Sequence, residues 1–219
     1  MDSINFSQML CSRLCHDLIT PIGAINTSLD LLNDSDAEDR MQLLELAKQS
    51  AEKAVRKLVF YRAAFGYSID SHFSTFKQTK DLIQDFLMIN KIKLFWNEEN
   101  QADQTSCLSS QLSTYGQLIA NLAFICSEIA PSGGKLLIEF TKRSSQEIHL
   151  KLEGKLVLLR PAILSALTGH LSEDETSPHI IQAIYTHKLC RKLHIDLNVH
   201  QEERVYLDLS LNVAAEKNI

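Results

Sequence analysis

Three side chains that could take part in group transfer lie close together near the start of the chain, at His16, Asp17 and Thr20. A neutral imidazole is a good nucleophile, and a neighbouring carboxylate can accept its proton or orient its ring. On a helix, Thr20 would lie one turn after His16 and could position the ring, while Arg13 would lie about one turn before it. The pattern suits a histidine that accepts a phosphoryl group. Arg13 would then either contact the phosphoryl oxygens or be an ordinary surface arginine.

The residues around His16 follow the period of an amphipathic helix from about Ile4 to Leu32. Apolar side chains recur every three or four positions, and His16 points nearly opposite the centre of their stripe. The residues one and two turns from His16 are small or polar, which would let a partner come close. Pro21 removes one backbone donor, so we expect a kink or a local loosening just after His16. The apolar stripe comprises Leu10, Leu14, Leu18, Pro21, Ile25, Leu29 and Leu32.

A second long helix is predicted from Asp36 to Phe65, after a polar turn. Ser35 and Glu38 form the pattern of a capping box at its start. A single hairpin can cover only part of each apolar stripe, whereas two hairpins paired in a four-helix bundle would bury both stripes. We therefore expect a homodimer, the alternative being that the hairpin packs on its own C-terminal domain. The second stripe comprises Leu44, Ala47, Ala51, Val55, Leu58 and Arg62.

The remainder of the chain predicts a separate α/β domain. A long apolar helix from Ser109 to Glu128 would lie between strands, and Lys77–Leu87 fits either a helix or a strand followed by a helix. The fold class is therefore α+β, with a helical hairpin at residues 1–68 and an α/β sandwich at residues 69–219, its helices on one face of a sheet. The other predicted elements are strands at Lys91–Trp96, Lys135–Lys142, Glu147–Leu152, His194–His200 and Val205–Val213, and helices at Arg160–Leu171 and His179–Leu193.

The segment Arg13–Gly23 resembles the phosphoacceptor box of two-component histidine kinases. In that box a histidine, an acidic residue and a proline at the fifth place after the histidine lie on the first helix of a dimerising hairpin. The Leu14–Pro21 run is similar, more closely still, to the ChpT-type histidine phosphotransferases of alphaproteobacteria. The resemblance is strong over the hairpin and loose elsewhere. It implies a phosphohistidine at His16 and a surface on which receiver domains dock. That surface would comprise Ser12, Ile19, Gly23 and Thr27.

The same resemblance implies which partners the chain would have. They would be the receiver domain of a hybrid histidine kinase similar to CckA and response regulators of cell-cycle control similar to CtrA and CpdR. Mg²⁺ would be supplied by the receiver domain, since the sequence offers no evident metal site of its own. Asp17 would keep the attacking nitrogen basic or take its proton.

The second domain resembles the ATP-binding (Bergerat-like) domain of histidine kinases in a degenerate form. Gln117–Leu122 and Ala130–Lys135 are similar to its opening helix and turn. Ile125, which has no oxygen for a hard cation, stands where that family has a second asparagine. Leu152–Lys155 lacks the family's Asp-x-Gly pattern, and Thr176–Ile180 has no glycine where backbone amides should cradle phosphates. We therefore expect no nucleotide cofactor, so His16 would receive its phosphoryl group from another protein.

Composition excludes several classes of protein. The 219 residues carry a net charge of −5, which argues against a nucleic-acid binder. No stretch predicts a signal peptide or a membrane span, so we expect a cytoplasmic protein that does not bind membranes. The five cysteines are scattered, which is typical of reduced thiols. Cys11, Cys15 and His16 could be taken for a metal site, but no second cluster completes a ligand set, and we expect both cysteines to be small buried hydrophobic residues.

Three other functions remain open. A divergent histidine kinase would still phosphorylate itself from ATP. An HD-type metal-dependent phosphohydrolase would combine His16 and Asp17 with further histidines, although the other histidines all lie beyond the hairpin at no typical metal-site spacing. A non-catalytic adaptor would bind receiver domains and would not need His16 at all.

Overall fold

The structure is a computed structural model that describes residues 2–34, 36–66, 73, 75–97, 112–142, 146–172, 176–202 and 205–213. Contacts divide the chain into two compact units, Met1–Arg62 and Ala63–Ile219. The division falls after Arg62, whereas the sequence predicts a boundary after residue 68, which lies outside the described residues. The two units are described separately.

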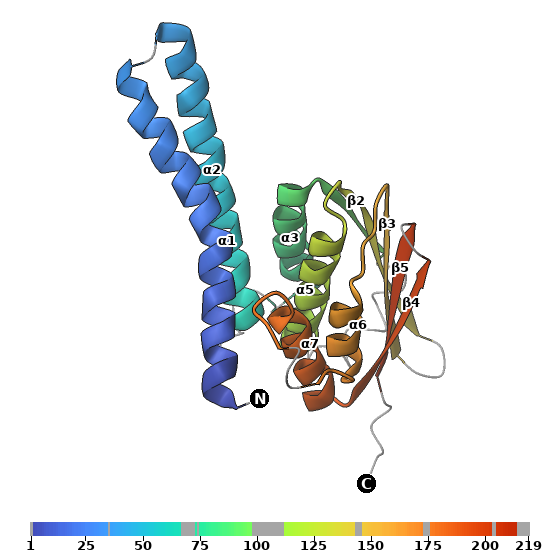
Figure 1. The fold of residues 1–219 in the computed structure, drawn as a ribbon. Coiled ribbons are helices and arrows are strands. Elements are labelled where there is room, and N and C mark those ends of the chain that lie inside the picture. Colours follow the sequence, from blue (N-terminus) through green and yellow to red (C-terminus); the bar gives the residue numbers. More distant parts are fainter. Residues whose placement is uncertain are drawn as a thin grey trace. The chain divides into compact units, whose positions relative to one another are not determined.

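The first unit is a helical hairpin. Helix α1 (Ser3–Leu31) is followed by a short 3₁₀ helix, η1 (Leu32–Asp34), and by helix α2 (Ala37–Phe65), whose last turn belongs to the second unit (Figure 1). Oδ1 of Asp36 accepts hydrogen bonds from the backbone N–H groups of Glu38 and Asp39, both at 3.0 Å. The first turn of α2 is therefore satisfied by Asp36. Ser35, which the sequence assigns to the cap, lies outside the described residues.

Helix α1 continues through Pro21 and changes direction partway along its length, as Figure 1 shows. The missing proline N–H accounts for such a bend. Small side chains line the seam between the two helices and allow their backbones to approach. The buried residues of this seam include Pro21, Ser28, Ala47, Ser50 and Ala54. The predicted apolar stripes are covered only in part, because Leu29, Leu44, Val55 and Leu58 remain 48%, 49%, 59% and 50% exposed.

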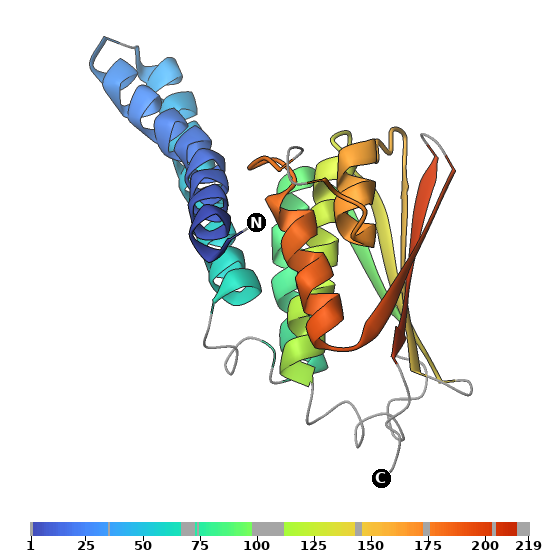
Figure 2. The same ribbon diagram turned by 60° about the horizontal axis from the view of Figure 1, so that its bottom comes forward.

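The second unit contains one five-stranded sheet in the order β1-β2-β3-β5-β4. Strands β1 and β2 pair in parallel, and every other neighbouring pair is antiparallel. Figures 1 and 2 show helices α3, α5, α6 and α7 on one face of this sheet. The strands are β1 (Ile92–Asn97), β2 (Gly134–Lys142), β3 (Gln146–Gly154), β4 (Ile195–Glu202) and β5 (Tyr206–Val213). The helices are α3 (Phe76–Leu87), α5 (Leu112–Ile129), α6 (Pro161–Thr168) and α7 (Ile181–Lys192), with a 3₁₀ helix η2 (Met88–Asn90).

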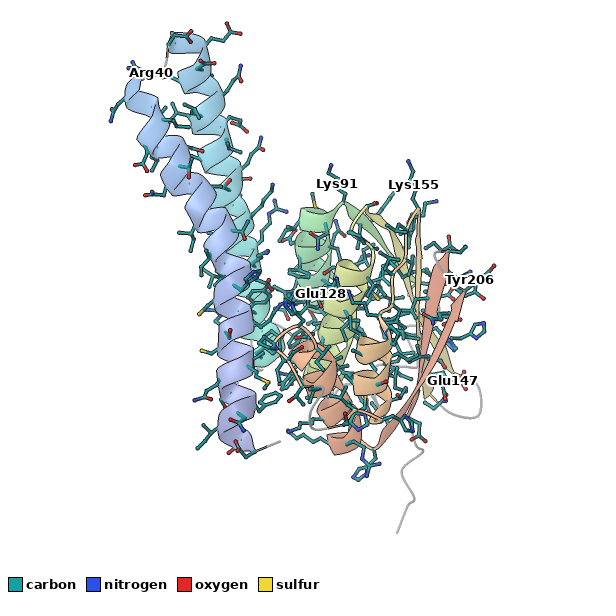
Figure 3. All side chains as sticks on the ribbon, in the orientation of Figure 1. Arg40, Lys91, Glu128, Glu147, Lys155 and Tyr206 are labelled. Carbon is teal, nitrogen blue, oxygen red and sulfur yellow. The ribbon has the colours of Figure 1, made fainter. Side chains whose placement is uncertain are left out.

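The core lies between the sheet and the helices. Alternate residues of β3, such as Ile148 and Leu150, are buried at 2% and 0% exposure. Figure 3 shows Glu147 of β3 and Tyr206 of β5 projecting from the opposite, uncovered face. This alternation is that of a sheet packed on one side only. The predicted α/β sandwich is therefore confirmed, and Lys77–Leu87 is helical throughout. In the part of the chain that the structure describes, no helix has the length and apolar character needed to cross a membrane.

Candidate functional site

His16 lies on α1 with its side chain 76% exposed. At about 100° per residue, Ser12, Gly23 and Thr27 lie within about 40° of His16 around the helix, and all three are exposed. A Cβ atom added to Gly23 would meet no atom within 4 Å, so the surface there is open. Within the described structure, nothing bulky on this side of α1 shields the imidazole.

Asp17 has a different environment from its neighbour, because it faces α2. Its side chain is 13% exposed, and its Oδ2 accepts hydrogen bonds from Nε of Arg13 at 3.0 Å and from the hydroxyl of Tyr61 at 2.9 Å. Nζ of Lys57 donates to the main-chain oxygen of Asp17 at 3.0 Å. The other carboxylate oxygen, Oδ1, lies 3.7 Å from Nδ1 of His16. This separation favours an electrostatic contact rather than a full hydrogen bond.

Burial shifts the pKa values of Tyr61 and Lys57 in opposite directions. Burial, and secondarily the charge of Asp17, raise the pKa of the Tyr61 phenol, so that it stays protonated and remains a donor at physiological pH. Burial lowers the pKa of Lys57, and the neighbouring Asp17 opposes that shift. The interior of the hairpin thus contains a polar cluster, Arg13, Asp17, Lys57 and Tyr61, that joins the two helices.

The predicted site residues divide between the two sides of α1. His16, Ser12, Ile19, Thr20, Gly23 and Thr27 are all exposed. Ile19 is 67% exposed, so its side chain is available for a contact with a partner. Arg13 is only 15% exposed, and its Nε donates to the largely buried carboxylate of Asp17 rather than lying on the open face beside His16.

Sequence reasoning did not find Lys57 and Tyr61. The stripe predicted on α2 ran through Leu58 and Arg62, one position away from each. The available signal was the spacing of seven residues that links Ala47, Ala54 and Tyr61, all of which are buried in the structure. A tyrosine in an otherwise small-residue seam needs a partner for its hydroxyl, and Asp17 is that partner.

The expectation that Cys11 and Cys15 are buried is wrong, since both are exposed. They lie on a side of α1 that α2 does not cover, whereas Cys126 and Cys190 in the second unit are buried. Among the described residues, no group of three or more histidine, cysteine, aspartate or glutamate side chains could hold a metal ion.

In the second unit, Asn121 of α5 has no exposed surface, and it makes hydrogen bonds through both of its polar atoms. Its Nδ2 donates to the main-chain oxygens of Ala64, at 3.0 Å, and of Gln117, at 2.7 Å. Its Oδ1 accepts a hydrogen bond from Nε2 of Gln182. Nε2 of Gln117 also donates to Ala64, at 3.0 Å, so that two buried amides satisfy a carbonyl in the last turn of α2. These hydrogen bonds tie α5 to the last turn of α2 and to α7.

The other segments that the sequence analysis compares with a nucleotide-binding domain also lie in structural positions. Ile125 is 1% exposed and belongs to the core. Gly133 adopts a left-handed conformation, with φ of 78°, in the turn that leads into β2. Leu152–Gly154 forms the end of β3, and Thr176–Ile180 leads into α7.

Three comparisons with known proteins agree with this geometry. The model of a family described as the histidine phosphotransferase C-terminal domain matches residues 76–205. The protein phosphotransferase ChpT of Brucella abortus (strain 2308) is 26% identical over 208 residues, which cover 91% of this chain and 92% of that protein. A solved bacterial phosphotransferase superposes with a TM-score of 0.77 and 23% identity, over 96% of this chain and 97% of the other. This last similarity shows that the fold is shared.

Proposed function

Because the chain belongs to the histidine phosphotransferase family, in which a protein phosphotransferase serves a two-component phosphorelay, we propose that His16 is the residue that carries the phosphoryl group. The observation that carries this proposal is the 76% exposure of the His16 side chain on an open helix face, next to a carboxylate that the hairpin holds in place. A nucleophile that must meet a phosphorylated protein needs such access.

In the proposed reaction, a receiver domain with an aspartyl phosphate docks on the exposed face of α1. The receiver brings its own Mg²⁺, which neutralises charge on the phosphoryl oxygens. Phosphoryl transfer has a loose transition state, so catalysis depends on in-line positioning and on charge neutralisation. On the hairpin, His16 supplies the attacking nitrogen, Asp17 orients the ring, and Thr20 lies one turn away where it can position the ring or a water. Ser12, Ile19, Gly23 and Thr27 would contact the receiver.

The proposal includes transfer without ATP. Both polar atoms of Asn121 are engaged in the core, and Ile125 offers no ligand where a kinase would need one. The Asn121 amide could bind a nucleotide only by giving up its buried hydrogen bonds to Ala64 and Gln182. These observations support a docking or structural role for the second unit.

We further propose that the hairpin pairs with a second copy. Each helix has a second, exposed stripe besides the residues in the seam. On α1 this exposed stripe lies roughly 100° around the helix axis from the residues that face α2. On α2 the exposed stripe is rotated from the seam by a similar angle and in the same direction, viewed from the N-terminus of each helix. Because the helices are antiparallel, both stripes lie on one side of the hairpin. This arrangement matches a four-helix bundle. The α1 stripe comprises Ile4, Cys11, Cys15, Ile22 and Leu29, and the α2 stripe includes Leu44, Val55 and Leu58.

The partners that we propose follow from the likeness to ChpT-type proteins. They are a hybrid histidine kinase similar to CckA and response regulators similar to CtrA and CpdR. The exposed face around His16 supports receiver domains as a class, and binding assays with individual receivers would separate the candidates.

The decisive experiment mixes the purified protein with a receiver domain phosphorylated by acetyl phosphate. Mass spectrometry under neutral conditions should find the added phosphate on His16, and the variant His16→Ala should gain none. A second arm uses labelled ATP without any partner. Labelling of His16 in that arm would identify a kinase and contradict the proposal, whereas an adaptor would retain its signalling output with alanine at position 16.

A further inference from the structure

The residue next to His16 is held from both helices of the hairpin. Tyr61 donates to Oδ2 of Asp17 at 2.9 Å, and Lys57, one turn earlier on α2, donates to the main-chain oxygen of the same residue at 3.0 Å. Arg13 donates to Oδ2 from within α1. Oδ2 thus has two donors, while Oδ1 is turned toward Nδ1 of His16 at 3.7 Å.

We infer that Tyr61 and Lys57 are positioning residues for phosphoryl transfer, because they orient Asp17 so that Nδ1 of His16 keeps its proton and Nε2 becomes the attacking nitrogen. The inference rests on the proposed function of His16. A carboxylate oxygen that faces one ring nitrogen favours the tautomer with the proton on that nitrogen. The opposite nitrogen then has the free electron pair, and the 76% exposure of the side chain leaves it accessible to a receiver.

The proposed step balances as follows. The neutral imidazole attacks phosphorus through Nε2, an N–P bond forms, and the bond between phosphorus and the receiver's aspartate oxygen breaks. That aspartate leaves as a carboxylate. The ring keeps its proton on Nδ1 and becomes positively charged, and Oδ1 of Asp17 faces this charge. The return transfer to a second receiver reverses the same steps.

A purely structural role for Tyr61 would require some partner for its buried hydroxyl, but not that the partner be the carboxylate next to His16. Tyr61 is 5% exposed and lies in a seam of small side chains, where a phenylalanine would fill the same space. Its hydroxyl ends on the carboxylate of the residue that follows His16. Lys57 converges on the main chain of the same residue, so two side chains of α2 fix one residue of α1.

The test measures the tautomer of His16 directly. Full-length protein labelled with ¹⁵N-histidine is compared by NMR with the variant Tyr61→Phe, above the pH at which free imidazole titrates, and the His16 signals are assigned from the spectrum of His16→Ala. We expect the Nδ1–H tautomer in the unaltered protein and a mixture of tautomers in the variant. Transfer from a phosphorylated receiver should slow by roughly ten- to a hundredfold, which is typical of losing an outer orienting group. Receiver affinity should stay the same.

Two further variants make the test selective. Ser50→Ala removes a different buried hydroxyl from the same face of α2 and should change neither the tautomer nor the rate. Lys57→Met keeps the aliphatic stem and should repeat the effect of Tyr61→Phe, which covers the case in which the phenylalanine variant does not fold. An unchanged tautomer in a folded variant would overturn the inference, as would a mixed tautomer with an unchanged rate. Failure of the proposed function has a different signature, namely transfer that survives His16→Ala.

Discussion

The hairpin and the α/β unit differ in whether their key polar side chains are exposed or buried. In the hairpin, the residue that we propose as the phosphoacceptor is on the surface: His16 is 76% exposed, and the carboxylate beside it is bound from the inside. In the α/β unit, the polar residue with the most hydrogen bonds described above is in the core: Asn121 has no exposed surface and bonds through both polar atoms. One unit thus exposes the histidine that we propose to react, while the other uses its amides to build its own fold.

The first way to break this comparison is to remove the exposed nucleophile. The variant His16→Ala should lose phosphoryl transfer by at least about a thousandfold, because no neighbouring group can replace a nucleophile. Its free energy of unfolding should change by no more than about 0.5 kcal/mol, because the side chain is exposed. Stopped reactions with a phosphorylated receiver and urea unfolding measure the two quantities. The matched control, His170→Ala, alters an exposed histidine of the second unit and should leave transfer intact.

The second test addresses the exposed apolar stripe of the hairpin. The double variant Ile22→Glu with Leu29→Glu places two carboxylates on the α1 stripe, where burial of unpaired charge is costly. It should elute as a monomer in size-exclusion chromatography with light scattering, at concentrations where the unaltered protein is a dimer. Lys53→Glu changes charge on another side of the hairpin and should stay dimeric. A dimer that tolerates both glutamates would place the interface elsewhere.

The third test addresses the buried amides of the α/β unit. Asn121→Ala leaves the amide of Gln182 without its acceptor and removes one of two donors to Ala64. We expect the free energy of unfolding of this unit to fall by roughly 2–3 kcal/mol, the cost of unsatisfied buried polar groups. Asn198→Ala, on an exposed position of β4, is the control. Full stability after Asn121→Ala would show that the buried amide is dispensable for packing.

The smallest expected effect concerns the cysteines. Burial raises the pKa of Cys126 and of Cys190 to about 12, from the ordinary value of 9.0, so both should resist alkylation at pH 8 while Cys11 and Cys15 react in the monomeric variant. The pKa of the two thiols is raised only in the folded protein, so above pH 9 they ionise more readily in the unfolded chain. The free energy of unfolding should therefore be unaffected by these thiols below pH 9 and should decline as pH rises from 9 toward 12. Peptide mapping after alkylation and unfolding curves at several pH values measure both effects.

Much of the fold follows from local pattern, because apolar periodicity and turn residues determine where helices and strands form. The order of elements in both units and the exposure of His16 agree with the sequence analysis. The polar cluster of Arg13, Asp17, Lys57 and Tyr61 could not be derived, because its bonds join residues 40 and 44 positions apart. Cys11 and Cys15 were misassigned because a residue beside an apolar stripe is buried only if a second element covers that side.

The α/β unit likewise has one feature that residue type predicts and another that depends on contacts between distant residues. The sequence shows that Ile125 replaces a ligand, since a side chain without oxygen can be recognised from its type alone. That Asn121 would bond to Ala64 and Gln182, 57 and 61 positions away, depends on tertiary packing. Residue identity therefore suffices to predict that Ile125 cannot ligate a cation, whereas only the structure reveals what Asn121 does.

Gly23 has a consequence for the energetics of the hairpin. Glycine inside a helix costs about 1 kcal/mol relative to alanine, and here no atom within 4 Å would obstruct a methyl group. Helix α1 is thus less stable than its surroundings require at a point two turns beyond His16, on the same side as the proposed phosphoacceptor. Gly23→Ala should therefore raise the midpoint of thermal unfolding. The natural glycine lowers the stability of α1, but it leaves the backbone uncovered on the side of the helix that a receiver would approach.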